Sequence, residues 1–171
     1  FKIEDWNNEL SPWEAPPAFG KKSFGSGATD TLEFIESKLI PMAKERYDFA
    51  DNAKAILGGY SLAGLFSLWS AYKSNTFSGI ATASPSVWFN GWEEFINNNT
   101  PLSKTIYLSL GDTEEKMKNK VMSAVGDNIR KQEELLKNDK INTILEWNKG
   151  GHFSDSDLRV AKAFVWCIEN S

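Results

Sequence analysis

Short apolar runs alternate regularly with longer amphipathic segments along this chain. The apolar runs cover residues 53–59, 79–83, 105–110 and 141–147, and each is closed by glycine or a small polar residue. Short buried strands that alternate with helices form βαβ units, in which the strands run parallel. We therefore expect an α/β fold, with a mostly parallel sheet and helices on both faces.

The segments around these runs predict further elements. Residues 1–6 are interpreted as the tail of a strand, and a helix is expected to start at Asp30, at the head of a capping-box sequence. Pro41 should kink or end that helix. Its buried face would carry Ile35, Leu39 and Met42. A last helix is expected after a cap at Ser154 or Asp155. Its inner face would carry Leu158, Ala161, Val165 and Ile168.

Composition narrows the classes of function. The 171 residues are 41% apolar and 25% charged, which is typical of one globular domain, here residues 1–171. The net charge of −4 argues against nucleic-acid binding, which usually needs a basic face. The single cysteine, Cys167, excludes an internal disulfide framework and favours a cytoplasmic location. A single histidine excludes a His/Cys zinc cluster, and no run approaches the roughly 18 apolar residues of a membrane helix.

Residues 59–64 have the pattern of a nucleophile elbow. They follow one predicted strand and open a helix, so Ser61 would sit on a sharp turn with small neighbours. The usual pattern is G-x-S-x-G, and here Ala63 takes the place of the second glycine. The alternative interpretation is a glycine-rich turn in which the serine is incidental.

His152 is the only histidine in the chain. It follows the last predicted strand, at the same edge of a parallel sheet as the Ser61 turn. If an imidazole of this chain activates Ser61, it must be His152. The alternative is an ordinary surface or core histidine.

A carboxylate that orients His152 would complete a serine–histidine–acid triad. If the triad residues occur along the chain in the order serine, acid, histidine, the acid should follow the strand predicted at residues 105–110. The candidates are Asp112, Glu114 and Glu115. Asp112 is closest to the strand end and could simply cap the turn, whereas the glutamates reach further, and we favour Glu114. The alternative is an acidic solvated loop and a serine–histidine dyad.

Other groups could bind the substrate or its oxyanion. The backbone N–H of Leu62, the residue after the nucleophile, is the expected oxyanion donor. Tyr60 and Trp88 are candidate substrate-binding residues, because both lie near predicted strand ends and could form an aromatic wall. Packing in the core or in loops is the alternative for the tryptophan.

Three blocks of sequence together resemble one family. They cover residues 59–68, 83–89 and 150–153, and include Ser61 and His152. In this order they are similar to the esterase D / enterochelin-esterase-like family of α/β-hydrolases. The resemblance implies an α/β-hydrolase sheet and hydrolysis of a small-molecule ester without a cofactor or metal. It also implies that Ser61 is the nucleophile and His152 the base.

The chain departs from the family pattern at three points. Ala63 replaces a glycine, the acid is ambiguous, and the first strands of the sheet are missing before Phe1. We therefore expect residues 1–171 to be the C-terminal portion of a single α/β-hydrolase domain. The second oxyanion donor would then also lie upstream of Phe1.

The leading interpretation is a serine carboxylic-ester hydrolase. An acyltransferase would use the same site with an alcohol in place of water. A non-catalytic binding domain could have the same turn at Ser61 without catalysing any reaction. Neither a nucleic-acid nor a membrane partner is expected, and the sequence indicates no particular oligomeric state.

Overall fold

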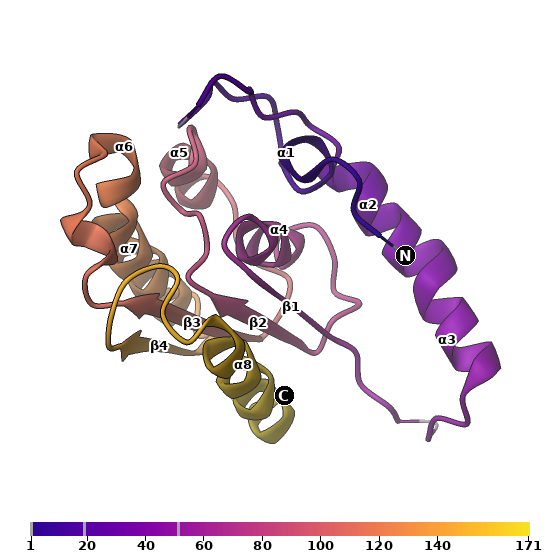
Figure 1. The fold of residues 1–171 in the computed structure, drawn as a ribbon. Coiled ribbons are helices and arrows are strands. Elements are labelled where there is room, and N and C mark those ends of the chain that lie inside the picture. The colour runs from indigo at the N-terminus through magenta and orange to yellow at the C-terminus, as the bar shows by residue number, and fades with distance from the viewer. Residues whose placement is uncertain (1, 19, 51) are drawn as a thin grey trace.

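Four parallel strands form the sheet of the computed structural model, which describes residues 2–18, 20–50 and 52–171. The strands are β1 (Ile56–Tyr60), β2 (Gly79–Ala83), β3 (Thr105–Gly111) and β4 (Asn142–Asn148). They lie side by side in chain order, and each pairs in parallel with the next (Figure 1). The prediction of a parallel α/β sheet is confirmed, and the predicted runs match the strands to within three residues at each end.

The two central strands form the buried centre of the molecule. Every residue of β2 and β3 is buried, whereas β1 and β4 lie at the two edges and are partly exposed. Because the central strands are covered on both faces, they consist almost wholly of apolar or small residues rather than alternating with polar ones.

Helices cover both faces of this sheet. On one face, α4 (Leu62–Ser70) packs against β1 and β2, and α7 (Val125–Asn138) packs against β3 and β4. On the other face, α8 (Ser156–Asn170) crosses β1, β2 and β3 (Figure 1). The larger apolar core lies on the α4 and α7 side. A smaller one lies under α8.

The remaining helices are short or lie outside these layers. They are α1 (Trp6–Glu9), α2 (Ala28–Phe34), the π-helix η1 (Ile35–Leu39), α3 (Ile40–Arg46), α5 (Trp92–Asn97), the 3₁₀ turn η2 (Glu114–Lys116) and α6 (Lys120–Ser123). The segments α2, η1 and α3 form one long helix beside α4 (Figure 1).

The predictions for the N-terminal third were partly wrong. Residues 2–5 form no strand, because Asp5 instead caps α1 by accepting a hydrogen bond from the N–H of Asn8. Phe1 lies outside the described residues. The long helix begins at Ala28, after Gly27, rather than at Asp30.

The long helix also continues past Pro41. A π-helical turn precedes the proline, which then stands in the first turn of α3. Of the three residues predicted to be buried, Ile35 packs against the core, but Leu39 and Met42 are exposed. The described sheet ends at β1, so its strands offer this half of the helix no surface to pack on.

The predicted inner face of α8 was wrong. Leu158, Val165 and Ile168 are 55%, 53% and 67% exposed, and Ala161 is exposed as well. The buried stripe is Arg159, Ala163 and Cys167. Ala163 and Cys167 are small enough to let the helix lie close to Ala81 and Tyr107 of the sheet. The start of the helix was predicted correctly, because its N-cap is Asp155, although no side-chain hydrogen bond forms there.

This orientation of α8 can be tested with a matched pair of variants. We expect Ala163→Glu to lower the free energy of unfolding by about 3 kcal/mol or more, because it buries an unpaired carboxylate against the sheet. Ala161→Glu, on the exposed side of the same helix, should stay within about 0.5 kcal/mol of the parent. Urea unfolding followed by circular dichroism measures both, and equal losses would contradict the observed orientation.

Candidate active site

Ser61 lies on a sharp turn between β1 and α4. Its backbone has φ 58° and ψ −120°, a strained conformation typical of a nucleophile elbow. The turn needs small residues, because a Cβ on Gly59 would lie only 2.4 Å from the carbonyl oxygen of Ala63. The N–H of Ser61 donates to the carbonyl of Ala83, which ties the turn to the end of β2.

His152 lies in the loop between β4 and α8, beside Ser61. Its Nε2 is 3.0 Å from the Oγ of Ser61, and its Nδ1 is 2.7 Å from Oε2 of Glu114. Because an ionised carboxylate can only accept, Nδ1 is the donor of the second hydrogen bond, and Nε2 is left to accept from the serine. The hydroxyl of Tyr60 donates to the backbone carbonyl of His152.

The three candidate acids occupy different places. Glu114, in η2, is the one that contacts the imidazole. Asp112 accepts instead from the N–H of Gly150 at 2.9 Å, and so braces the loop that carries His152. Glu115 points away and forms an ion pair with Arg130 at 2.7 Å.

The carboxylate of Glu114 is almost fully enclosed, with a side-chain exposure of 3% against 16% for His152. Its second oxygen, Oε1, accepts from the Oγ of Ser84 at 2.7 Å and from the N–H of Gly111 at 2.8 Å. A Cβ on Gly111 would lie 2.9 Å from this oxygen, so the close approach requires glycine. Burial raises the pKa of Glu114, but hydrogen bonds from His152, Ser84 and Gly111 outweigh it and hold the pKa below its ordinary value.

Several residues around the site were not predicted from the sequence. Arg159, on the buried side of α8, lies 3.1 Å from Oε1 of Glu114 and is 1% exposed. Ser84 has a positive φ of 45°, and the Oγ of Ser86 lies 3.4 Å from that of Ser61. Both serines lie in one of the blocks that carry the family resemblance, and this was their only signal. The signal for Arg159 was weaker still: a lone arginine seven residues after the histidine.

Leu62 begins α4, directly after the serine turn. Its N–H therefore belongs to the first turn of a helix, where backbone N–H groups have no partner within the helix. The positive end of the helix dipole also lies there. This is the environment that an oxyanion donor requires.

A cavity of about 600 Å³ opens beside Ser61 and His152. Tyr60 forms part of its wall. The other lining residues are Phe153, Ser156, Asp157, Val160 and Ala161. Trp88 is not among them, because it packs against Phe24 and Phe89, at ring-centre distances of 6.0 and 6.5 Å.

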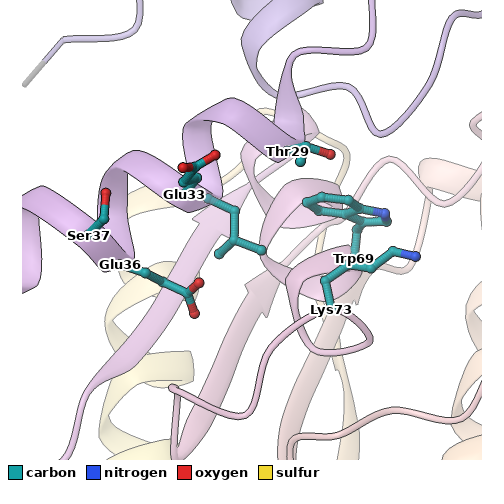
Figure 2. Close-up of a pocket in the computed structure, with 7 residues that line it drawn as sticks. Thr29, Glu33, Glu36, Ser37, Trp69 and Lys73 are labelled. Carbon is teal, nitrogen blue, oxygen red and sulfur yellow. The ribbon is translucent and has the colours of Figure 1, made fainter.

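A second hollow, of about 510 Å³, lies between the long helix and α4 (Figure 2). It is lined by Thr29, Leu32, Glu33, Glu36, Ser37, Trp69 and Lys73. Its polar groups are partly engaged, since Glu36 accepts a hydrogen bond from Ser74 and the ammonium of Lys73 lies 6.0 Å from the ring centre of Trp69. The only histidine of the chain lines the other cavity, so the pairing of a hydroxyl with an imidazole occurs beside Ser61 and not here.

Residues 2–18, 20–50 and 52–171 contain neither a metal-ligand cluster nor a membrane-spanning helix. Within these ranges, no three or more His, Cys, Asp or Glu side chains gather in a way that could hold a metal ion. In the same part of the chain, no helix has both the length and the apolar character needed to cross a membrane.

Comparisons with known proteins identify a family and a fold. A family model described as "Putative esterase" matches residues 3–153. Among curated proteins, none matches the chain.

Solved structures with the same fold include three esterases or hydrolases. The siderophore hydrolase EstA from Aspergillus nidulans superposes with a TM-score of 0.71 at 20% identity, over 97% of this chain and 67% of its own. The enterobactin esterase FES from Shigella flexneri gives a TM-score of 0.67 at 17% identity, over 82% and 38%. The Bacillus cereus carboxylesterase gives 0.58 at 19% identity, over 84% and 61%. These likenesses confirm the predicted α/β-hydrolase fold, and the chain spans about two thirds of EstA and less of the others.

The buried carboxylate of Glu114 should make stability depend on pH. Its pKa is lower in the folded protein than the ordinary value of 4.5, so the folded state binds fewer protons than the unfolded chain in this range. The contribution is therefore fully present above about pH 4.5 and is lost as the pH falls through the folded pKa.

We expect Glu114→Gln to lower the free energy of unfolding by about 3 kcal/mol at pH 7, because Arg159 loses its charged partner. At pH 3 the loss should be clearly smaller. Urea unfolding of the two proteins at both pH values measures the difference. A loss of the same size at pH 3 and pH 7 would show that the charge of Glu114 contributes nothing.

Proposed function

The chain belongs to the esterase family described as "Putative esterase", and we propose that it hydrolyses carboxylic esters with Ser61 as nucleophile, His152 as base and Glu114 as acid. The observation that carries the proposal is the continuous chain of contacts from Ser61 Oγ to His152 Nε2, at 3.0 Å, and from His152 Nδ1 to Glu114, at 2.7 Å. This is the geometry of nucleophile, base and orienting group that acyl transfer requires.

In the proposed reaction, Ser61 Oγ attacks the ester carbonyl while His152 Nε2 takes its proton. The resulting imidazolium is stabilised by the carboxylate of Glu114. The N–H of Leu62 donates to the oxyanion. His152 then returns the proton to the leaving alcohol, which leaves an acyl group on Ser61. Water, activated in the same way by His152, releases the acid and restores the enzyme.

The cavity beside Ser61 has room for a small organic ester. Its apolar walls, Phe153, Val160 and Ala161, suit an acyl or aryl group, and Tyr60 adds an aromatic edge. Two of the structural neighbours are named as a siderophore hydrolase and an enterobactin esterase. Siderophore-type esters therefore belong in the first substrate panel, beside short-acyl, feruloyl and thioester substrates.

The panel also separates the two kinds of acyl transfer. Hydrolysis gives the free acid whether or not an alcohol is added, whereas an acyltransferase would give a new ester with glycerol or a sugar.

The absence of nucleic-acid, membrane and metal partners and the cytoplasmic location stay predictions. Failure of the folded protein to cleave any ester in the panel would leave a binding domain as the better interpretation.

The first kinetic prediction concerns the pair Ser61 and His152. Each single change to alanine should lower kcat by about 10⁴-fold or more, and the double variant should be hardly worse, because residues that act as a unit are not additive. The hydrolysis of p-nitrophenyl acetate measures this, with Ser26→Ala, at an exposed serine outside that cavity, as the control that keeps its activity.

One result would exclude the mechanism. Because the chain has no other histidine, full hydrolysis by His152→Ala would mean that another group takes the proton. Addition of EDTA should change nothing, and a loss of activity would indicate a metal site.

The second prediction distinguishes the three acids. Glu114→Gln keeps the shape of the side chain but removes the charge that fixes His152, so we expect kcat to fall by about 10²- to 10⁴-fold. Asp112→Asn can still accept from Gly150, and Glu115→Gln only breaks an ion pair with Arg130, so both should stay within about threefold of the parent. Small and equal effects from all three would favour a serine–histidine dyad.

A further inference from the structure

Arg159 occupies a buried position behind the proposed triad. It is 1% exposed, although it lies in the first turn of a helix whose other side faces solvent. One end of its guanidinium, Nη1, donates to Oε1 of Glu114 and to the Oγ of Ser84, each at 3.1 Å. The other end, Nη2, donates to the backbone carbonyls of Lys149 and Gly151, at 3.2 and 3.1 Å.

The guanidinium therefore joins the proposed acid to the loop that carries the proposed base. Gly151 directly precedes His152 and Lys149 lies three positions before it, so the position of these two carbonyls fixes the backbone that carries the imidazole. Nη1 also lies 3.5 Å from the hydroxyl of Tyr60, which donates to the carbonyl of His152 itself. A planar fork of fixed donors can hold these acceptors together, whereas an ammonium cannot.

The two oxygens of Glu114 are divided between two tasks. Oε2 accepts from His152, and Oε1 accepts from Arg159, Ser84 and the N–H of Gly111. With Oε1 held by three donors, rotation of the carboxylate away from His152 would break several hydrogen bonds at once. The positive charge of Arg159, 3.1 Å from Oε1, also favours the ionised form of Glu114, which burial alone would disfavour.

A purely stabilising role would not account for these contacts. A buried ion pair gains little stability over well-packed apolar side chains, because both charges lose their water. Here all the partners of Nη1 and Nη2 belong to, or contact, the segments that hold His152 and Glu114. The guanidinium does not line the cavity beside Ser61, so it does not contact the substrate.

We propose that Arg159 is a positioning residue for ester hydrolysis, which holds Glu114 and the 149–151 loop so that Nδ1 of His152 donates to the carboxylate and Nε2 faces Ser61. The inference rests on the proposed function for its kinetic consequences. Its structural consequence, the tautomer of His152, can be measured whether or not the protein cleaves esters.

Three variants test the kinetic consequence. Arg159→Met removes the charge and the fork, Arg159→Lys keeps the charge alone, and Arg130→Met is the matched control at an exposed arginine. We expect kcat to fall by about 10- to 100-fold in Arg159→Met, as for other residues that orient a reacting group. Arg159→Lys should lie between it and the parent. KM should stay within about threefold, because a group that does not touch the substrate does not contribute to uniform binding.

The single histidine makes the structural test direct. In protein labelled with ¹⁵N-histidine, the ring nitrogens of His152 are the only imidazole signals, apart from any tag, and their chemical shifts report which nitrogen carries the proton. At pH 8.5 we expect the Nδ1–H tautomer in the parent and in Arg130→Met. In Arg159→Met the Nε2–H tautomer should gain population, with a smaller gain in Arg159→Lys.

The outcomes separate the possibilities. An unchanged tautomer in both Arg159 variants overturns the proposal, even if kcat falls, because the role would then be merely structural. A shifted tautomer in a protein that cleaves no ester would support the positioning role and reject the proposed function instead. If Arg159→Met does not fold, as judged by circular dichroism, the same two measurements on Arg159→Lys decide, and parent-like values for both overturn the proposal.

Discussion

The hydrogen-bonded carboxylate of Glu114 ties together three strand ends and one helix. It accepts from Gly111 at the end of β3 and from Ser84, which follows β2. It also accepts from His152, which follows β4, and from Arg159 of α8. Elements far apart in sequence thus meet on two oxygen atoms that have almost no access to water. A buried carboxylate is costly unless it is fully paired, so the position of each of these elements constrains the others.

The parallel sheet explains why these groups can meet at all. In such a sheet the carboxyl ends of all strands point the same way, so the loops that follow them lie together at one end of the sheet. The four strands are followed in turn by Ser61, Ser84, Glu114 and His152. Each loop therefore contributes one polar group to the same place. The sharp turn at Ser61 then presents its hydroxyl to the imidazole rather than to the sheet.

This topology also decides what could be predicted from the sequence. Apolar runs mark the strands well, because both faces of the sheet are buried. The polar residues that follow those runs must gather at the carboxyl end of the sheet. Ser61, His152 and Glu114 could be proposed on that basis. Arg159 could not, because helical periodicity selects the most apolar stripe of α8, while the stripe that is buried consists of small residues and a charged one. Pairing with Glu114 makes that burial possible, and pairing is a tertiary property that no local pattern reports.

Covalent labelling shows directly whether Ser61 is an activated nucleophile. A fluorophosphonate reacts with a serine hydroxyl only when a base withdraws its proton, so ordinary surface serines stay unlabelled. We expect one phosphonyl group to become attached per molecule and peptide mass spectrometry to locate it on Ser61. Ester hydrolysis should be lost in proportion to labelling. A folded protein that cleaves esters while Ser61 stays unlabelled, or that carries the label on another serine, would contradict the proposed mechanism.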